Sequence, residues 1–198
     1  MQPFTTVTSI VAPLERSNVD TDQIIPKQFL KRIERTGYGE FLFYDWRQEP
    51  GFVLNQPQFK GAEILVAGKN FGCGSSREHA AWALGQYGFR AILAPSFADI
   101  FHSNAGKNGI LLITLPEEKI EQILLQAKSG DSYTLTISLE ENTIRDAFGL
   151  NESFTIDPFR RDCLLGGLDD IALTLRHADA LAAFTQQHDA KPWLRARA

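Results

Sequence analysis

The sequence has few cysteines, no long hydrophobic run and no large excess of charge of either sign. Its two cysteines are too few for a disulfide framework, and they cannot hold an iron–sulfur cluster or a structural zinc alone. No apolar run approaches the roughly 18 residues of a membrane span, and the N-terminus lacks the pattern of a secretory signal. The net charge is −4, which disfavours nucleic acid and anionic membranes as partners. We therefore expect a cytoplasmic protein.

The composition is typical of one soluble globular domain. Hydrophobic residues make up 43% and charged residues 22% of the 198 residues, enough to bury a core without metal or disulfide staples. Short apolar runs alternate with segments of helical periodicity, which predicts an α/β fold with a three-layer β/β/α arrangement. The predicted strands are residues 4–14, 63–67, 91–94, 110–115, 132–139 and 154–157. The predicted helices are residues 26–31, 77–87, 97–105, 116–128 and 169–187.

Residues 32–61 form a long stretch in which glycine and proline interrupt every regular pattern. A loop of this length in a compact domain is usually functional or disordered. Its many aromatic residues argue against disorder. We expect a lid or a partner-facing surface in preference to a packed structural loop, and we expect it to be largely mobile in the isolated chain.

The segment NFGCGSSREHA, residues 70–80, is the richest in candidate chemistry. It lies between a predicted buried strand and a predicted helix, where ligands gather in open α/β sheets. Gly72 and Gly74 permit close backbone approach, the helix start favours an anion, and Arg77 offers a planar fork for a carboxylate. The spacing fits neither a Walker A loop nor G-x-G-x-x-G, which disfavours mononucleotides. The segment predicts a carboxylate or phosphate site.

Structural interpretations of the same residues remain open. Ser75 and Glu78 spell the S-x-x-E capping box, so Ser75 could simply cap the helix. His79 could be a core histidine, and Arg77 a solvated charge. Cys73, near a helix start, could be an activated nucleophile of a cysteine hydrolase, but a small apolar filler is the favoured interpretation.

Four long runs together resemble one known family. They are NVDTDQIIPKQFLKRIERTGYGEFLF, GKNFGCGSSREHAAWAL, GFRAILAPSFADIFHSNAGKNGIL and IDPFRRDCLLGGLDDIALTL. They resemble the small subunits of bacterial 3-isopropylmalate dehydratases, in the aconitase superfamily. The resemblance implies a swivelling β/β/α domain like the aconitase C-terminal domain. It would span residues 1–198, with a lid-like loop at 32–61 and a helical extension at 158–198.

The resemblance also implies an activity shared between two chains. The family isomerises 2-isopropylmalate and 3-isopropylmalate by dehydration and rehydration in leucine biosynthesis. The [4Fe–4S] cluster belongs to a separate large subunit, so this chain would bind no cofactor itself and would be active only in the complex. The alternatives are a related hydro-lyase, acting on citraconate, dimethylmaleate or homoaconitate, and a non-catalytic anion-binding module.

The resemblance assigns roles to residues of the 70–80 segment and of the DTDQ run. Ser75 matches the serine that removes the proton next to a carboxylate, and Arg77 matches the arginine that grips a substrate carboxylate. Ser76 matches a neighbour that hydrogen-bonds near the same group. Asp22 matches an aspartate that reaches the active site, where it would orient a histidine of the large subunit.

Residues 26–39 match the loop that reads the substrate side chain. Arg32 is the candidate for a second substrate contact, with Lys31 and Arg35 as alternatives. Ile25 stands where aconitase has a serine, which points away from aconitase itself.

Overall fold

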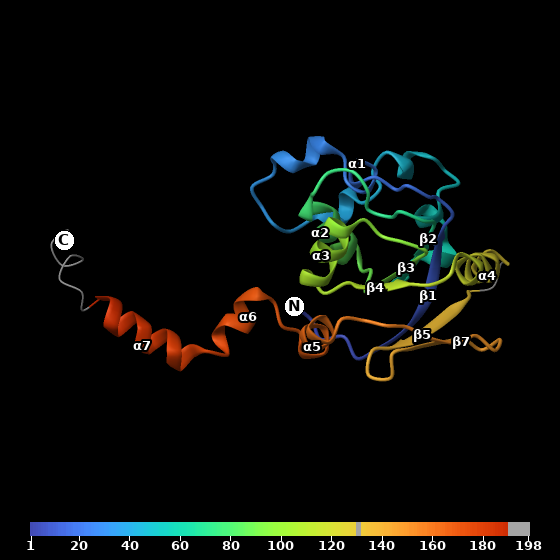
Figure 1. Ribbon diagram of the computed structural model, residues 1–198. Helices are drawn as coiled ribbons and strands as arrows, with labels where there is room; N and C mark the ends of the chain where they lie inside the picture. Colours follow the sequence, from blue (N-terminus) through green and yellow to red (C-terminus); the bar gives the residue numbers. More distant parts are fainter. Residues whose placement is uncertain (130–131, 190–198) are drawn as a thin grey trace.

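The computed structural model describes residues 1–129 and 132–189, and within them the chain forms a seven-stranded mixed sheet (Figure 1). The strand order is β4-β3-β2-β1-β5-β6-β7, with β1 to β4 parallel and β5 to β7 antiparallel. The bounds are β1 Thr6–Leu14, β2 Ile64–Ala67, β3 Ala91–Ala94, β4 Leu111–Thr114, β5 Thr134–Ser138, β6 Thr143–Arg145 and β7 Asn151–Ser153.

Helices cover both faces of the parallel half. Helices α2 and α3 pack on one face, and α4 packs on the other (Figure 1). The α-helices are α1 Thr21–Ile24, α2 Glu78–Tyr87, α3 Asp99–Lys107, α4 Glu117–Lys128, α5 Pro158–Gly166, α6 Asp170–Leu175 and α7 Ala178–Asp189. The 3-10 helices are η1 Lys27–Lys31, η2 Tyr38–Phe41, η3 Trp46–Gln48, η4 Val53–Asn55 and η5 Pro57–Phe59.

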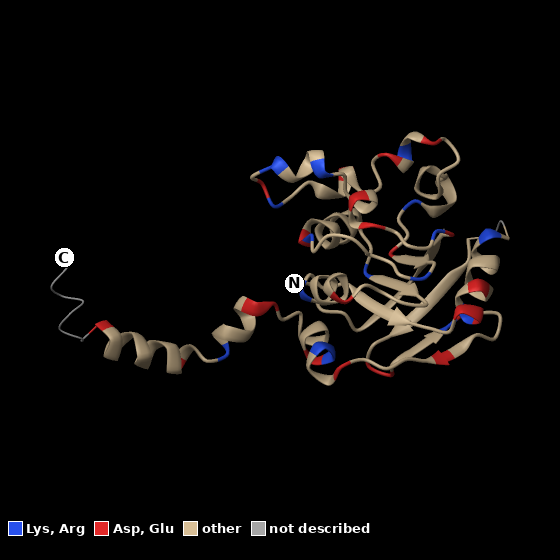
Figure 2. Cartoon of the chain, turned by 45° about the horizontal axis from the view of Figure 1, so that its top comes forward, with Lys and Arg blue, Asp and Glu red and all other residues tan. Residues whose placement is uncertain are grey.

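Successive residues of the buried strands supply two separate cores. In β2, Leu65 and Ala67 join the cluster under α2 and α3, whereas Ile64 and Val66 join the cluster under α4. Ile137 of β5 and residues of β6 belong to the α4 cluster as well, so the antiparallel half curls over the same core as the parallel half. Strands β1 to β4 contain no charged residue, and the charges of both signs lie around the outside (Figure 2).

Residues 38–61 contribute to the core under α2 and α3, whereas the sequence favoured a lid or a partner-facing surface over a packed loop across 32–61. Their buried side chains are Tyr38, Leu42, Phe43, Phe52, Val53, Leu54 and Phe59. Most of the aromatic residues that suggested a partner surface therefore lie in this core or pack against it, whereas Tyr44 is 38% exposed. Residues 32–37 are the longest exposed run of the predicted lid, shorter exposed runs follow between its buried side chains, and the mobility of the stretch stays a prediction.

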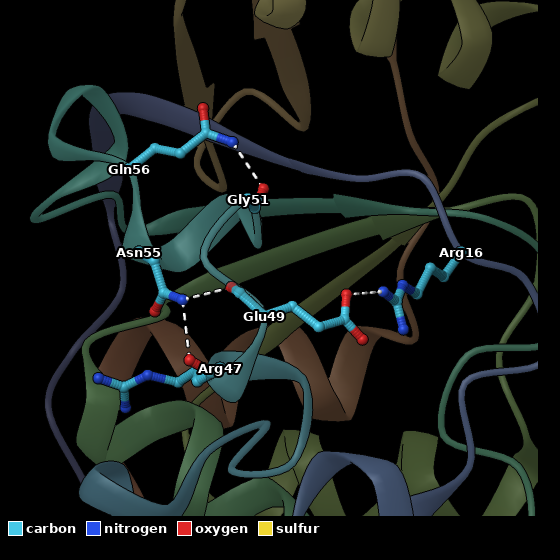
Figure 3. Close-up of polar contacts among 6 residues, drawn as sticks. All are labelled: Arg16, Arg47, Glu49, Gly51, Asn55 and Gln56. Carbon is cyan, nitrogen blue, oxygen red and sulfur yellow. Dashed lines mark hydrogen bonds and ion pairs between the residues drawn. The ribbon is translucent and has the colours of Figure 1, made fainter.

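Side-chain hydrogen bonds also stabilise residues 47–56, which form no strand or α-helix (Figure 3). Asn55 Nδ2 donates to the carbonyl oxygens of Arg47 at 2.9 Å and Glu49 at 2.8 Å. Arg16, at the end of β1, donates to the Glu49 carboxylate at 3.1 Å and lies over the Trp46 ring. These contacts satisfy backbone groups that a helix or sheet would otherwise satisfy.

Two predictions for the C-terminal third are wrong. Residues 154–157 are not a strand, because the ladder ends with β7 at Ser153 and Pro158 begins α5. The single helix predicted over 169–187 is two helices, α6 and α7. Arg176 N–H bonds to the Leu173 carbonyl and His177 N–H to the Thr174 carbonyl, a 3-10-type closure that ends α6. Residues 190–198 of the predicted extension lie outside the described residues.

The C-terminal arm, residues 170–189, extends away from the body of the molecule (Figure 1). Its exposed large apolar side chains are Ile171, Leu175, Leu181 and Phe184. Across residues 1–129 and 132–189, no helix is long and apolar enough to cross a membrane.

Candidate active site

The candidate site lies where the carboxyl ends of β1, β2 and β3 meet. The loops that follow these strands are joined by backbone hydrogen bonds, from Asn18 N to Lys69 O at 2.8 Å and from Phe71 N to Ser96 O at 3.1 Å. This edge is the place where parallel α/β sheets present ligand-binding groups. The three loops therefore act as one platform for the 70–77 turn, the residues between β2 and α2.

The inner half of the 70–77 turn is packed against the rest of the chain. Gly72 N donates to the Val19 carbonyl at 2.8 Å, and Gly72 has a φ of +76°. A Cβ at Gly72 would lie 2.6 Å from Cβ of Phe101, and one at Gly74, whose φ is +88°, would lie 2.6 Å from Cγ of Asp20. Both positions therefore require glycine for two reasons, a left-handed backbone and the lack of space.

The outer half of the turn presents Ser75 and Ser76 to solvent. The Ser75 carbonyl accepts hydrogen bonds from Thr21 Oγ1 at 3.1 Å and from Arg77 N at 2.7 Å. Helix α2 begins at Glu78, with Arg77 as the N-cap residue in extended conformation. The capping role considered for Ser75 is therefore wrong, because the contact with Thr21 holds Ser75 outside the helix and its hydroxyl remains available for chemistry.

Arg77 and Asp22 form an ion pair beside Ser75. The Arg77 side chain is 20% exposed and that of Asp22 is 49% exposed, so the pair opens to the surface of the turn. A guanidinium carries more N–H donors than one carboxylate oxygen uses, so Arg77 retains the capacity to hold a second anion. The structure thus places Asp22 against Arg77, which follows Ser75 and Ser76 in the turn, and the roles that the resemblance implies for these four residues stay predictions.

Arg32 approaches the same end of α2 through an aromatic layer. Its guanidinium lies 5.1 Å from the Phe41 ring centroid and 5.9 Å from that of Tyr38. The Tyr38 ring meets the His79 ring edge-on at 5.3 Å, and His79 lies in the first turn of α2, two residues after Arg77. Arg32 also pairs with Glu34 at 3.7 Å.

The two alternatives to Arg32 remain open. Lys31 ends η1 and is exposed. Arg35 lies with its guanidinium 5.9 Å from the Trp82 ring. Substrate contact by any of the three residues stays a prediction.

Neither Cys73 nor His79 has the character of an activated catalytic group. Burial raises the pKa of the Cys73 thiol, and the charge of Asp20 raises it further, which disfavours the nucleophilic thiolate. Burial lowers the pKa of His79, whose ring packs against Tyr38 and Trp82. Both residues fit the structural interpretation considered from the sequence.

Sequence reasoning missed Asp20. Its carboxylate accepts from Asp22 N at 2.7 Å, and its N–H donates to Gln23 Oε1 at 2.9 Å, which caps α1 and orients Asp22 toward Arg77. The D-x-x-Q spacing of a capping box was the available signal. The described part of the chain contains no group of three or more His, Cys, Asp or Glu side chains that could hold a metal ion.

Comparison with known families agrees with this site and fold. The family model of the aconitase C-terminal domain matches residues 1–118, which is more than half of the chain. The fold and the 70–77 turn thus define an aconitase-type C-terminal domain. Two further models match, LeuD_N over residues 121–158 and the C-terminal domain of the 3-isopropylmalate dehydratase small subunit over residues 170–197.

Proteins of similar sequence identify a particular family within the aconitase-type domains. 3-Isopropylmalate dehydratase small subunits from Acidobacterium capsulatum and Koribacter versatilis are 66% and 58% identical, over 100% and 95% of this chain and 96% and 100% of theirs. The crystal structure of 3-isopropylmalate dehydratase from Methanocaldococcus jannaschii is 26% identical, with a TM-score of 0.68 over 90% of this chain and 99% of that one. The chain belongs to the family of 3-isopropylmalate dehydratase small subunits, which confirms the predicted family and fold class.

Proposed function

We propose that this chain provides half of the active site of a hydro-lyase that interconverts 2-isopropylmalate and 3-isopropylmalate in leucine biosynthesis. The observation that carries the proposal is an exposed serine, Ser75, held beside the Arg77–Asp22 pair at the carboxyl edge of the sheet. A relative that is 66% identical over 100% of this chain bears the name of this enzyme's small subunit, which supports the assignment.

Ser75 would remove the proton from the carbon next to a substrate carboxylate while the hydroxyl leaves from the neighbouring carbon. A serine hydroxyl is a weak base unless the charge on its oxygen is stabilised. The positive end of α2 and the Arg77 guanidinium are the groups at hand for this stabilisation. The exposed position of Ser75 allows a substrate bound to a second chain to reach it.

Arg77 would bind the substrate carboxylate with its remaining N–H donors, and the Ser76 hydroxyl would hydrogen-bond beside it. Asp22 neutralises Arg77 when no substrate is bound, and its half-exposed carboxylate can also orient a histidine of a partner. Arg32 would contact a second carboxylate from the exposed end of the predicted lid.

The partner in this proposal is the large subunit, to which the [4Fe–4S] cluster would belong. The described residues of this chain hold no group of three or more metal ligands, and the proposal assigns the cluster to the other chain. The C-terminal arm supports a partner as well, because it exposes Ile171 at 72% and Phe184 at 62%. Apolar side chains gathered on a projecting arm are typical of a surface that another chain covers. A cytoplasmic complex, without nucleic acid or membrane, is part of the proposal.

The test is to reconstitute the complex anaerobically with a cluster-loaded large subunit from the same source. Dehydration of isopropylmalate is then monitored by the ultraviolet absorbance of the dehydrated product. The proposal expects turnover of isopropylmalate by the mixture and none by this chain alone. A parallel panel of citraconate, dimethylmaleate and homoaconitate identifies a related hydro-lyase if one of them is the better substrate. Anion binding by this chain alone, with no turnover in a mixture whose cluster is intact, would contradict the proposal and favour a non-catalytic module.

A further inference from the structure

Gln86, on the last turn of α2, clamps the exposed segment that precedes η2. Its side-chain Oε1 accepts a hydrogen bond from Tyr38 N at 2.8 Å, and its Nε2 donates to the Arg35 carbonyl at 2.8 Å. One amide thus closes both ends of the stretch from Arg35 to Tyr38. The Gln86 amide suits this role because the two bonds need an acceptor and a donor on the same side chain.

Gly39 seats the same segment on the helix backbone. A Cβ at Gly39 would lie 2.7 Å from the carbonyl carbon of Gln86 and 2.7 Å from Tyr87 N. The backbone at Gly39 therefore packs directly against the backbone of the last turn of α2. This contact comes one residue after Tyr38, whose N–H donates to the Gln86 side chain. Gly37, with a φ of +83°, supplies the turn that leads into this contact.

The clamp also fixes the surroundings of Arg32. The Arg32 guanidinium lies over the Tyr38 ring at 5.9 Å, and its Nη2 would be 3.4 Å from a Cβ at Gly37. Tyr38 is fully buried and its ring meets His79, in the first turn of α2. Gln86, at one end of α2, thus holds the aromatic residue whose ring contacts both Arg32 and His79, and His79 lies two residues after Arg77.

We infer that Gln86 is a positioning residue for substrate binding, one that acts through the 31–37 segment without touching substrate. The inference rests on the proposed function, in which a cation of this segment contacts a carboxylate. Without the clamp, the segment populates positions in which this cation is displaced. The apparent affinity then falls in proportion to the competent fraction, while turnover of the bound complex changes little.

The test uses Gln86→Met, which removes both hydrogen bonds, and Gln86→Glu, which keeps the acceptor for Tyr38 N and loses the donor to Arg35. Gln122→Met, on the exposed side of α4, is the matched control. In the reconstituted complex we expect a KM about tenfold higher for Gln86→Met and an intermediate value for Gln86→Glu, with kcat within about twofold of wild type. The control is expected to change neither.

Amide hydrogen exchange of the isolated chain gives the second readout. The Tyr38 N–H is expected to exchange faster in Gln86→Met and close to wild type in Gln86→Glu, since a carboxylate still accepts it. An unchanged KM in an active complex, or a fall in kcat with KM unchanged, overturns the inference and leaves the proposed function standing. An inactive wild-type complex with an intact cluster overturns both.

Discussion

The two halves of the 70–77 turn differ in how closely the rest of the chain packs against them. The inner half has its backbone bonded to Val19 and its two glycines pressed against Phe101 and Asp20. The outer half leaves Ser75 and Ser76 exposed. If the proposed function holds, the first half contributes stability and the second half chemistry, so we expect substitutions in the two halves to separate folding from activity.

Ser75→Ala should have the largest effect, confined to activity. The reconstituted complex is expected to lose on the order of 10³-fold in kcat, the usual contribution of a positioned proton-transfer group. The unfolding midpoint should stay within the small range of exposed substitutions, because the hydroxyl caps no helix. Ser138→Ala, on β5, is the control for activity. Full activity of Ser75→Ala would assign the base elsewhere.

Gly72→Ala should show the reverse pattern. The new Cβ would lie 2.6 Å from Cβ of Phe101 at a φ of +76°, so we expect a loss of about 2–4 kcal/mol in the free energy of unfolding. Gly61→Ala is the matched control, because Gly61 has a φ of +79° and nothing within 4 Å of its Cβ position. Denaturant unfolding of both variants separates crowding from backbone strain, and equal losses would show that packing on Phe101 contributes nothing.

Arg77→Lys tests the junction between the two halves. Lysine keeps the charge and the pairing with Asp22 but loses the planar fork, so one charged hydrogen bond to a substrate carboxylate is lost. We expect kcat/KM to fall about 30-fold, which corresponds to about 2 kcal/mol. Arg145→Lys, in the exposed pair with Glu141, should leave the kinetics unchanged. Wild-type kinetics of Arg77→Lys would mean that this arginine is structural.

Leu175→Asp extends the comparison to the C-terminal arm. Leu175 is 61% exposed, so the substitution should leave the unfolding midpoint of the isolated chain unchanged. If the large subunit covers the arm, the dissociation constant of the complex should rise about tenfold. This rise corresponds to the loss of about 1.4 kcal/mol of binding free energy from apolar contact. Leu125→Asp, on α4 and 72% exposed, is the control. Equal affinities of both variants would remove the arm from the interface.

The smallest effect is expected at Cys73, whose thiol should react only slowly with an alkylating reagent. Because its pKa is raised by burial and by Asp20, little thiolate is present near neutral pH, and less still as the pH falls. Alkylation by iodoacetamide at pH 7 is expected to be slower than for a free thiol in solution, as followed by mass spectrometry. Rapid alkylation would reopen the role of a nucleophile.

The sequence located the buried strands better than it located the contacts around them. The predicted strand 91–94 coincides with β3, because a short apolar run between polar residues is typical of a buried strand. Ser75, Arg77 and Asp22 were predicted together, through a resemblance spanning most of the chain. Pattern alone identified the turn at 70–77 but could not pair Arg77 with Asp22, residues more than fifty positions apart.

The errors share a physical cause, a long-range contact or a local closure that leaves no periodic signal. The S-x-x-E spacing left a cap at Ser75 open as an alternative, but α2 begins at Glu78 and the Ser75 carbonyl accepts a hydrogen bond from Thr21. The break between α6 and α7 contains neither glycine nor proline. Most aromatic residues of 38–61 lie in the core or pack against it, and only the tertiary fold distinguishes a buried phenylalanine from one at an interface.

The measurement that tests the account most directly is amide hydrogen exchange across residues 70–78, with and without the large subunit. Exchange in the inner half, around Gly72, should be slow in both states because its N–H already bonds to Val19. Exchange at Ser75 and Ser76 should slow at least about tenfold on complex formation, if the outer half completes a shared active site. Unchanged exchange at Ser75 and Ser76 in a complex shown to have formed would contradict the claim that this turn faces the partner.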